Sequence, residues 1–553
     1  MADGNDEHRL TDGVSVEAIK TFLADLTKEF PDTYTEMTTA DACKQLVVPR
    51  TQQASCAYVD LLRKQSPCTD VGKATVFVSH AWRYKIADVL NVLLEFAEEQ
   101  ASKEDGQPVF FWFDLFMNNQ NANVTANLPQ EWWSTTFKES IANIGRVLLV
   151  LMPWRDPVPL TRAWCLWEIF CGISNEGTEV NIRLPKSEEK ALERAIQGEY
   201  EAVTDTLVRV QAERAEAFNP NDKAMIFQAT QDSVGFAALN QAVKDQLRAW
   251  CLEKAAAAVE AMQARGEDNT GAFAVLCGQV GTVLNTFGEH GRAVAYYEAA
   301  LATYLRIEGE KGENVAGLYN NLGLAYDDKG DNDKAIAYFE KAREILVGKL
   351  GEKHPSTAST YNNLGNAYSI KGEHDKAITY YEKDLAITTQ TLGEKHPSTA
   401  TAYNNLGNAY CSKGEYDKAI DHYEKDLAIT IQTLGEKHPS TAETYNNLGN
   451  AYCSKGEHEK AIAYYEKDLA ITTQTLGEKH PSTAMTLTNI AFVHAELGDK
   501  EQACAYMQRA LDVFTATVGP DHPSTQRAEH DLRRIRHAGV DVPSGSSRCC
   551  SIL

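Results

Sequence analysis

The fold of this chain is decided by a stretch of 42 residues that runs from Gly393 to Leu434 and reads GEKHPSTATAYNNLGNAYCSKGEYDKAIDHYEKDLAITIQTL. Its opening block, GEKHPST, recurs at a constant interval of 42 residues, which is marked by four histidines: His354, His396, His438 and His480. More divergent copies upstream complete six units over residues 267–518. A period of this length indicates a solenoid, in which each unit stacks only on its neighbours.

Each unit is predicted to be a hairpin of two helices. Pro397 stands near the start of the first helix, where its missing N–H does no harm, and Gly414 ends that helix as a left-handed cap. Four residues form the apolar stripe of the first helix: Tyr403, Leu406, Gly407 and Tyr410. Six form the stripe of the second: Ala419, Ile420, Tyr423, Leu427, Ile431 and Leu434. Gly407 and Ala419 are small where the two helices would cross closely. Because one hairpin cannot bury its own apolar face, stacking must supply the core.

The pattern Leu-Gly…Tyr…Ala…Tyr resembles a tetratricopeptide repeat. The longer block LGEKHPxTAxxxNNLGxxY is similar to the variant found in kinesin light chains and nephrocystin-3-like proteins. The resemblance covers residues 267 to about 535 and implies an all-α solenoid that binds proteins. One position departs from the family, because Asp384, Asp426 and Asp468 stand where alanine is usual. This departure predicts a slightly altered helix crossing in the middle units.

In that family the first helix of each unit lines a concave groove, where asparagines clamp the backbone of an extended peptide. Seven asparagines occupy the equivalent positions in this chain: Asn320, Asn362, Asn366, Asn404, Asn408, Asn446 and Asn450. An amide side chain offers a donor and an acceptor together, which suits a peptide whose own groups need partners. The alternative is that these asparagines are solvent residues or form hydrogen bonds within the array.

Residues 75–185 alternate short apolar runs with helical patterns, which predicts an α/β domain with a parallel sheet covered on both faces. Four strands are expected, at residues 75–78, 108–113, 146–152 and 180–184. Ligands of such sheets bind beyond the carboxyl ends of the strands. Ser79, His80 and Trp82 follow the first strand and Asp114 follows the second, so these residues are nucleotide-binding candidates. A structural hydrogen-bonding role is the alternative for His80.

Two segments of this domain resemble a TIR domain: FVSHAW at residues 77–82 and WCLWEI at residues 164–169. The resemblance implies a flavodoxin-like fold that can self-associate. In TIR domains that cleave NAD, the glutamate of the second segment is catalytic, which makes Glu168 the candidate and adds Trp164 to the nucleotide contacts. A carboxylate near the ribose could stabilise oxocarbenium-like charge as nicotinamide departs. The alternatives are that Glu168 hydrogen-bonds the backbone or Arg162, and that the domain is an interaction module only.

The remaining segments are assigned by their patterns: a helical extension with a disordered tip at 1–74, a helical connector at 186–262, a capping helix at 519–537 and a flexible tail at 538–553. The last four residues begin with Cys550 and end with Leu553, which fits a C-a-a-X prenylation box. Cys549 is a candidate second acylation site, and a second signal matters because one lipid chain anchors weakly. The alternative is an unmodified tail.

Composition excludes several classes of protein. The net charge is −23, which disfavours nucleic-acid binding because that function needs a clustered basic surface. The twelve cysteines lack CxxC spacing, so the sequence indicates no metal site and no redox pair. No apolar run approaches the ~20 residues of a membrane helix, and the first residues are unlike a signal peptide. The expected location is the cytoplasm, with membrane association only through a prenylated C-terminus.

Two functions remain open from the sequence, and neither requires a cofactor. The first is a scaffold whose repeat groove binds extended peptides while the TIR-like domain relays or recruits, with motor-cargo adaptation as a special case. The second is a sensor in which Glu168 cleaves NAD, as a substrate, under control of the array.

Overall fold

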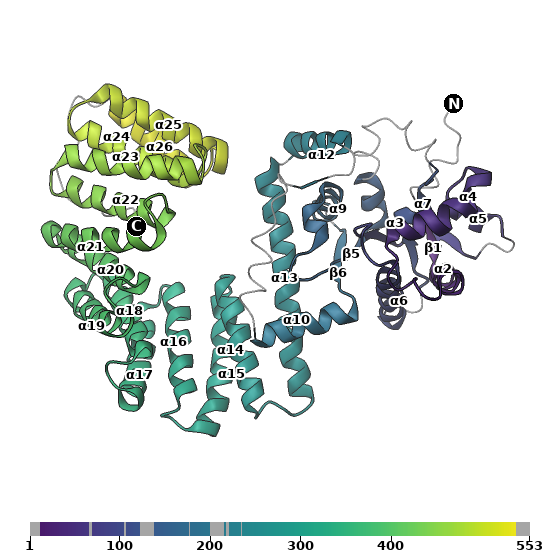
Figure 1. The fold of residues 1–553 in the computed structure, drawn as a ribbon, viewed down its shortest axis with the longest axis horizontal. Coiled ribbons are helices and arrows are strands. Elements are labelled where there is room, and N and C mark those ends of the chain that lie inside the picture. Colours follow the sequence, from purple (N-terminus) through teal and green to yellow (C-terminus); the bar gives the residue numbers. More distant parts are fainter. Residues whose placement is uncertain are drawn as a thin grey trace. The chain divides into compact units, whose positions relative to one another are not determined.

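The computed structural model describes residues 11–65, 69–103, 107–121, 138–175, 177–198, 215–216, 220–233 and 235–537. The chain divides into two compact units, residues 1–268 and residues 269–553 (Figure 1). The predicted lipidation sites Cys549 and Cys550 lie outside the described residues, as do the N-terminal tip and the predicted flexible tail at 538–553.

The N-terminal unit is built on a six-stranded sheet in the order β2-β1-β4-β3-β5-β6. Its parallel part has four strands: β4 (Phe110–Trp112), β3 (Val76–Ser79), β5 (Arg146–Val150) and β6 (Glu179–Arg183). The central strand β3 is buried along its whole length, as expected for a run of branched and aromatic residues covered on both faces. Its Phe77 pairs with Trp112 on one side and with Val147 on the other. The predicted parallel strands are confirmed, with ends that differ by one or two residues.

Two further strands were missed by the sequence reasoning. β1 (Asp12–Ser15) pairs antiparallel with both β4 and β2 (Val71–Lys73), so the sheet is mixed rather than purely parallel. The segment 1–74 is therefore not only a helical extension, because it supplies one edge of the sheet. The strands escaped notice because DGVS and VGK are too short to show an alternating pattern, and only long-range pairing makes them strands.

Helices complete the N-terminal unit: α2 (Val16–Glu29), α3 (Thr39–Ala42), α4 (Val48–Thr51), α5 (Tyr58–Arg63), α6 (Ile86–Lys103), α7 (Asp114–Met117), α9 (Ala163–Ile173), α10 (Lys186–Gly198), α12 (Pro220–Ser233) and α13 (Gly235–Ala264). The side chain of Ser15 caps α2 by accepting a hydrogen bond from the backbone N–H of Ala18. Helix α9 packs on β3, β5 and β6, while α12 and α13 pack on α9. The connector helices therefore cover the helix that carries the candidate catalytic glutamate.

The C-terminal unit contains six consecutive helix pairs and a final helix within its described residues (Figure 1). The helices are α14 (Gly271–Thr286), α15 (His290–Glu308), α16 (Glu313–Asp328), α17 (Asn332–Leu350), α18 (Pro355–Ile370), α19 (His374–Leu392), α20 (Pro397–Lys413), α21 (Tyr416–Leu434), α22 (Pro439–Ser454), α23 (His458–Thr475), α24 (Pro481–Glu496), α25 (Lys500–Val518) and α26 (Pro523–His537). The recurring GEKHPST block has a structural role at the start of each helix pair that it precedes. In each copy the histidine caps the next helix: His396 Nδ1 accepts from Ser398 N at 3.1 Å, and Pro397 follows at the first helical position.

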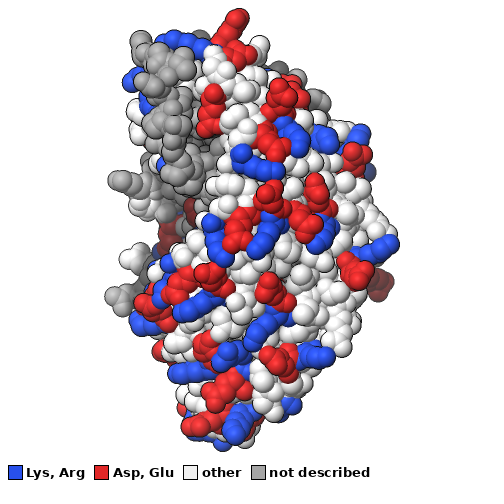
Figure 2. Space-filling view, turned by 90° about the vertical axis from the view of Figure 1, so that its left-hand side faces the viewer, with Lys and Arg blue, Asp and Glu red and all other residues white. Residues whose placement is uncertain are grey.

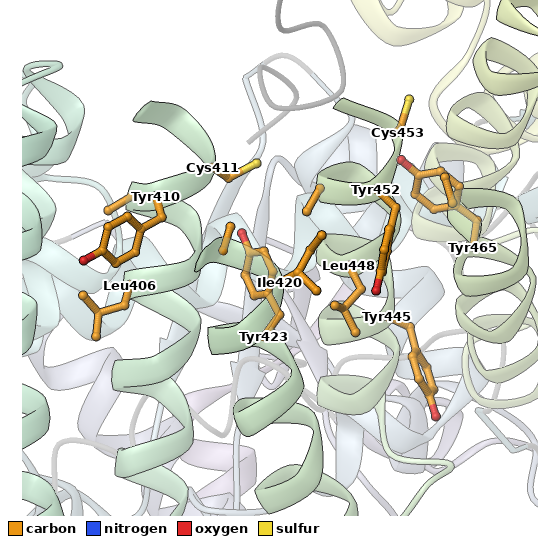
Figure 3. Packing of buried hydrophobic residues seen from close by; sticks show 14 of the residues in the cluster. Leu406, Tyr410, Cys411, Ile420, Tyr423, Tyr445, Leu448, Tyr452, Cys453 and Tyr465 are labelled. Carbon is orange, nitrogen blue, oxygen red and sulfur yellow. The ribbon is translucent and has the colours of Figure 1, made fainter. Parts of the chain in front are cut away.

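The two helices of each pair cross closely, as the small residues predicted. A Cβ built on Gly407 would lie 2.5 Å from the ring of Tyr423, so any larger residue would force that ring to move. The side chains of Leu406, Tyr423 and Leu448, from three successive helices, belong to one buried cluster (Figure 3). The prediction that Leu434 belongs to the buried stripe of the second helix was wrong, because its side chain is 45% exposed at the end of α21.

Candidate functional site

The first candidate site lies at the carboxyl end of β3, where Ser79 meets the α9 residue Glu168. Ser79 is fully buried, and its Oγ donates a hydrogen bond of 2.6 Å to Glu168 Oε2. Burial raises the pKa of Glu168 to about 8, and the charge of Asp114 adds to the rise while the hydrogen bond from Ser79 opposes it. Within the described structure the partner of Glu168 is thus Ser79, whereas the sequence suggested the backbone or Arg162.

Asp114 organises the other side of the same site. Trp82 Nε1 donates a hydrogen bond of 2.5 Å to Asp114 Oδ2, while His80 Nδ1 lies 3.8 Å from Asp114 Oδ1. The ring of His80 is buried against Phe113 at a centroid distance of 4.8 Å, and burial lowers its pKa although Asp114 opposes that shift. His80 Nε2 is buried without a hydrogen-bond partner among the described residues.

Five of the six predicted residues of this site therefore lie together: Ser79, His80, Trp82, Asp114 and Glu168. Trp164, the sixth, is partly buried at the start of α9, two residues after its N-cap Arg162. Sequence reasoning missed Cys165, whose buried Sγ donates a 3.5 Å hydrogen bond to the backbone oxygen of His80. This contact ties α9 to the loop after β3 and fixes the distance between the two halves of the site.

The second candidate site is a chain of polar side chains that repeats through the array. In the unit of α18 and α19, Tyr381 Oη donates to Asn366 Oδ1 at 2.6 Å. Asn366 Nδ2 then donates to Asn362 Oδ1 at 3.2 Å, and Asn362 Nδ2 donates to Asp384 Oδ2 at 3.3 Å. The next two units repeat this Tyr–Asn–Asn–Asp chain with the following residues: Tyr423, Asn408, Asn404 and Asp426, then Tyr465, Asn450, Asn446 and Asp468.

The structure thus gives the predicted groove asparagines a role inside the array. Most amides in the chain give one hydrogen and one lone pair to internal bonds, as Asn404 does between Asn408 and Asp426. Asn446 is the exception, because its Oδ1 also accepts from Asn489 Nδ2 at 3.5 Å. A primary amide has a second hydrogen and a second lone pair, and these asparagines are only partly buried, so part of their capacity faces outward. Asn320 differs, because its Nδ2 donates to Thr360 Oγ1 of the next unit at 3.0 Å.

The buried aspartates also connect neighbouring units. Thr444 Oγ1 of α22 donates to Asp426 of α21 at 2.7 Å, and Thr486 makes the same 2.7 Å contact with Asp468 one unit later. The equivalent position beside Asp384 is Ala402, which has no hydroxyl. Burial raises the pKa of Asp384 to about 6, and a hydrogen bond from the Asn362 side chain opposes that rise. The aspartates, which the sequence suggested only as a change of helix crossing, are acceptors in a network between units.

The ends of the helix pairs carry exposed ion pairs that repeat with the units. Lys413 Nζ lies 2.8 Å from Asp375 of the preceding unit and 2.6 Å from Glu415, and Lys455 has the same two kinds of partner. Figure 2 shows acidic and basic side chains interspersed over the face in view. Water and salt screen exposed pairs of this kind, so they contribute little to stability and do not by themselves indicate a binding site.

Comparison with known proteins identifies the repeating unit. The tetratricopeptide repeat profile matches six overlapping segments: residues 272–346, 314–390, 356–432, 398–474, 440–515 and 482–537. Residues 272–537 are a tetratricopeptide-repeat array. Proteins with such arrays typically bind other proteins, and the closely crossed helix pairs described above are the units of this one.

Several solved structures are similar to the tetratricopeptide-repeat array. One, from Podosopora anserina and described as a kinesin light chain with nearly identical TPR-like repeats, is 26% identical, with 37% of this chain and 98% of that chain covered and a TM-score of 0.35. BtubC (BKLC) from P. vanneervenii is also 26% identical, with coverage of 41% and 91% and a TM-score of 0.37. No match was found among the curated proteins. Among the described helices, none is both long and apolar enough to cross a membrane.

Proposed function

We propose that the tetratricopeptide-repeat array binds extended segments of partner proteins, and that the TIR-like unit relays or recruits in response. The observation that carries this proposal is the Tyr–Asn–Asn–Asp chain, which recurs in three consecutive units. The internal bonds hold each amide in one orientation and leave it a second hydrogen and, except in Asn446, a second lone pair for a ligand. A side chain that is already ordered loses less conformational entropy when a peptide binds, so the same contacts give a higher affinity.

The near-identity of the units supports a repetitive or multivalent ligand. Residues 393–434 and 435–476 differ at only seven positions, and the Tyr–Asn–Asn–Asp chain is present in both copies. Two like surfaces in fixed register bind two like segments of one chain more tightly than either alone, because the second contact forms at high effective concentration. Duplication without a new function remains the alternative that the experiment must exclude.

The test selects ligands for the full chain from a random peptide display library and measures their affinity for two triple variants. The first variant replaces the outer asparagines by alanine: Asn362, Asn404 and Asn446. The control replaces the buried tyrosines by phenylalanine, which removes an internal hydrogen bond and keeps every amide: Tyr381, Tyr423 and Tyr465. We expect the affinity to fall at least ~10-fold in the asparagine variant and less in the control, because each lost backbone hydrogen bond contributes about 0.5–1.5 kcal/mol. An unchanged affinity in the asparagine variant would refute the proposal that these asparagines bind the peptide.

NAD cleavage by the N-terminal unit is the second candidate function. The favouring observation is the contact between Ser79 and Glu168 at the carboxyl end of a parallel strand, where ligands of open α/β sheets bind. Glu168 has a pKa of about 8, and groups whose pKa is shifted toward neutral pH are enriched at catalytic sites. A bound cation such as the nicotinamide ring would favour the carboxylate form, which then stabilises the charge that develops on the ribose.

Release of nicotinamide from NAD by the purified full chain tests this candidate, with and without forced clustering of the protein. Glu168→Gln should abolish release, whereas Glu179→Gln, at an exposed position on β6, should leave it unchanged. Absence of nicotinamide release, even after clustering, would refute NAD cleavage as a function of this chain. Release that survives in Glu168→Gln would refute the role of this residue.

A further inference from the structure

Three side chains with the chemistry of metal ligands meet near the C-terminal end of the array. They come from three successive helices: Cys453 from the end of α22, His458 from the start of α23 and Glu496 from the end of α24. Cys453 Sγ lies 3.6 Å from Glu496 Oε2, and His458 Nδ1 lies 3.5 Å from the same oxygen. All three ligand atoms lie within 4.8 Å of one another.

The separations of the cysteine sulfur and the histidine nitrogen from the Glu496 oxygen match those of ligands around one tetrahedral zinc ion. With Zn–S near 2.3 Å and Zn–N and Zn–O near 2.0–2.1 Å, tetrahedral geometry puts neighbouring ligand atoms roughly 3.3–3.6 Å apart. The two contacts to Glu496 have that length. The thiol of Cys453 donates a hydrogen bond to the carboxylate, while the histidine–carboxylate contact is too long for a hydrogen bond. His458 Nδ1 is moreover buried without a hydrogen-bond partner among the described residues, which is a cost that a metal ion would remove.

We propose that Cys453, His458 and Glu496 bind one Zn²⁺ ion, with a water molecule as the fourth ligand. Thiolate, imidazole and carboxylate are the three ligand types that zinc takes in proteins, and the thiolate selects against magnesium and calcium. The cysteine is only 5% exposed, so it contributes a sheltered ligand, while the carboxylate lies nearer the surface and leaves an entry path. The ion links α22, α23 and α24, and therefore two consecutive units.

The preceding junction of the array provides a natural control. One period earlier, the three positions are Cys411, Tyr416 and Ser454. The two junctions share the same turn, because Lys413 and Lys455 make equivalent ion pairs at it. Of the three ligand types only the cysteine is present at both junctions. A metal ion that needs all three ligand types should therefore bind at the Cys453 junction and not at the Cys411 junction.

The test titrates Co²⁺ into the full chain after removal of bound metal, under reducing conditions without added thiol. Co²⁺ occupies zinc sites and reports a thiolate ligand by a charge-transfer absorption in the near ultraviolet. We expect one such site per chain, with the absorption lost on addition of stoichiometric Zn²⁺. Cys453→Ser should remove the absorption, and Cys411→Ser should keep it.

A second variant, His458→Tyr, carries the same test with little risk to the fold, because tyrosine stands at the equivalent position one unit earlier. Loss of one ligand should weaken Co²⁺ binding by at least ~10-fold, since even indirect partners of metal ligands contribute 10–100-fold. Absence of the absorption in the unaltered protein overturns the proposal. An absorption that persists in Cys453→Ser also overturns the proposal, because it would come from other cysteines. Equal loss of the absorption in Cys411→Ser would overturn it too.

Discussion

Replacing Ala402 by threonine should stabilise the junction between α19 and α20, because it restores a hydrogen bond that the two following junctions contain. Thr444 and Thr486 each donate to a buried aspartate at 2.7 Å, while Asp384 faces an alanine. The junction has room for the larger side chain, since Thr444 occupies the equivalent position at 2% exposure. Ala402→Thr therefore adds a donor without a change in the packing that its neighbours already tolerate.

The size of the effect follows from the pKa of Asp384. That pKa is about 6 in the folded protein against roughly 3.9 in an unfolded chain, so ionisation of the carboxyl costs the fold about 3 kcal/mol. The sign follows from proton binding: the folded state binds more protons between about pH 4 and pH 6, so stability falls as pH rises through that window. A hydroxyl that donates to the carboxylate should recover about 1.5–3 kcal/mol at neutral pH and only about 0.5–1.5 kcal/mol near pH 4, where the carboxyl is neutral.

Hydrogen exchange measured by mass spectrometry resolves this change, because it reports the local stability of α19 and α20 within the full chain. At pH 7 exchange in Ala402→Thr should slow by about 10-fold to 100-fold relative to the unaltered protein, since each 1.4 kcal/mol is tenfold. Thr444→Ala should speed exchange in α21 and α22 by a similar factor. Equal slowing near pH 4 and at pH 7 would refute the electrostatic argument, as would no slowing at pH 7 while Thr444→Ala has its effect.

Three further predictions concern other parts of the chain. Gly407→Ala should lower the local stability of α20 and α21 by about 1–3 kcal/mol, as measured by hydrogen exchange, because the new methyl group overlaps the ring of Tyr423. The control Gly348→Ala should show no such loss, because Gly348 has open space around it. If the N-terminal unit cleaves NAD through a carboxylate, kcat/KM for nicotinamide release should rise with pH through about 8, the pKa of Glu168. If Cys550 is prenylated, protein from a eukaryotic host should carry a prenyl mass increment that disappears in Cys550→Ser, and absence of the increment from the unaltered chain would refute prenylation.

The fold was predictable where the chain repeats itself and where strands are long enough to show a pattern. The 42-residue period marks the last four helix pairs most clearly, because GEKHPST carries the N-cap and the first helical proline together there. The central strand β3 was recognisable as an apolar run. The edge strands β1 and β2 were not, because three or four residues acquire their structure from pairing with partners about sixty residues away.

The candidate sites also differ in how far the sequence could predict them. Ser79 and Glu168 are 89 residues apart, and only the resemblance to a TIR domain suggested that they belong together. The metal ligands gave no signal, since Cys453 and His458 lack the spacing of a zinc motif and Glu496 lies 43 residues after Cys453, close to one period of the array. Stacking of equivalent helix ends brings residues one period apart into contact. Ligand sets across a repeat junction therefore have to be sought at the period of the array rather than at the short spacing of a motif.

The few differences between the two nearly identical units are more informative than their likeness. Two of the seven differing positions are Thr444 in place of Ala402 and His458 in place of Tyr416. The first adds a donor to a buried aspartate, and the second adds a ligand beside a cysteine that both units share. Both changes lie at junctions between helices, while the asparagine chain is unchanged. The shared residues thus suit a ligand that repeats along the array, whereas these two differences change the contacts at individual junctions.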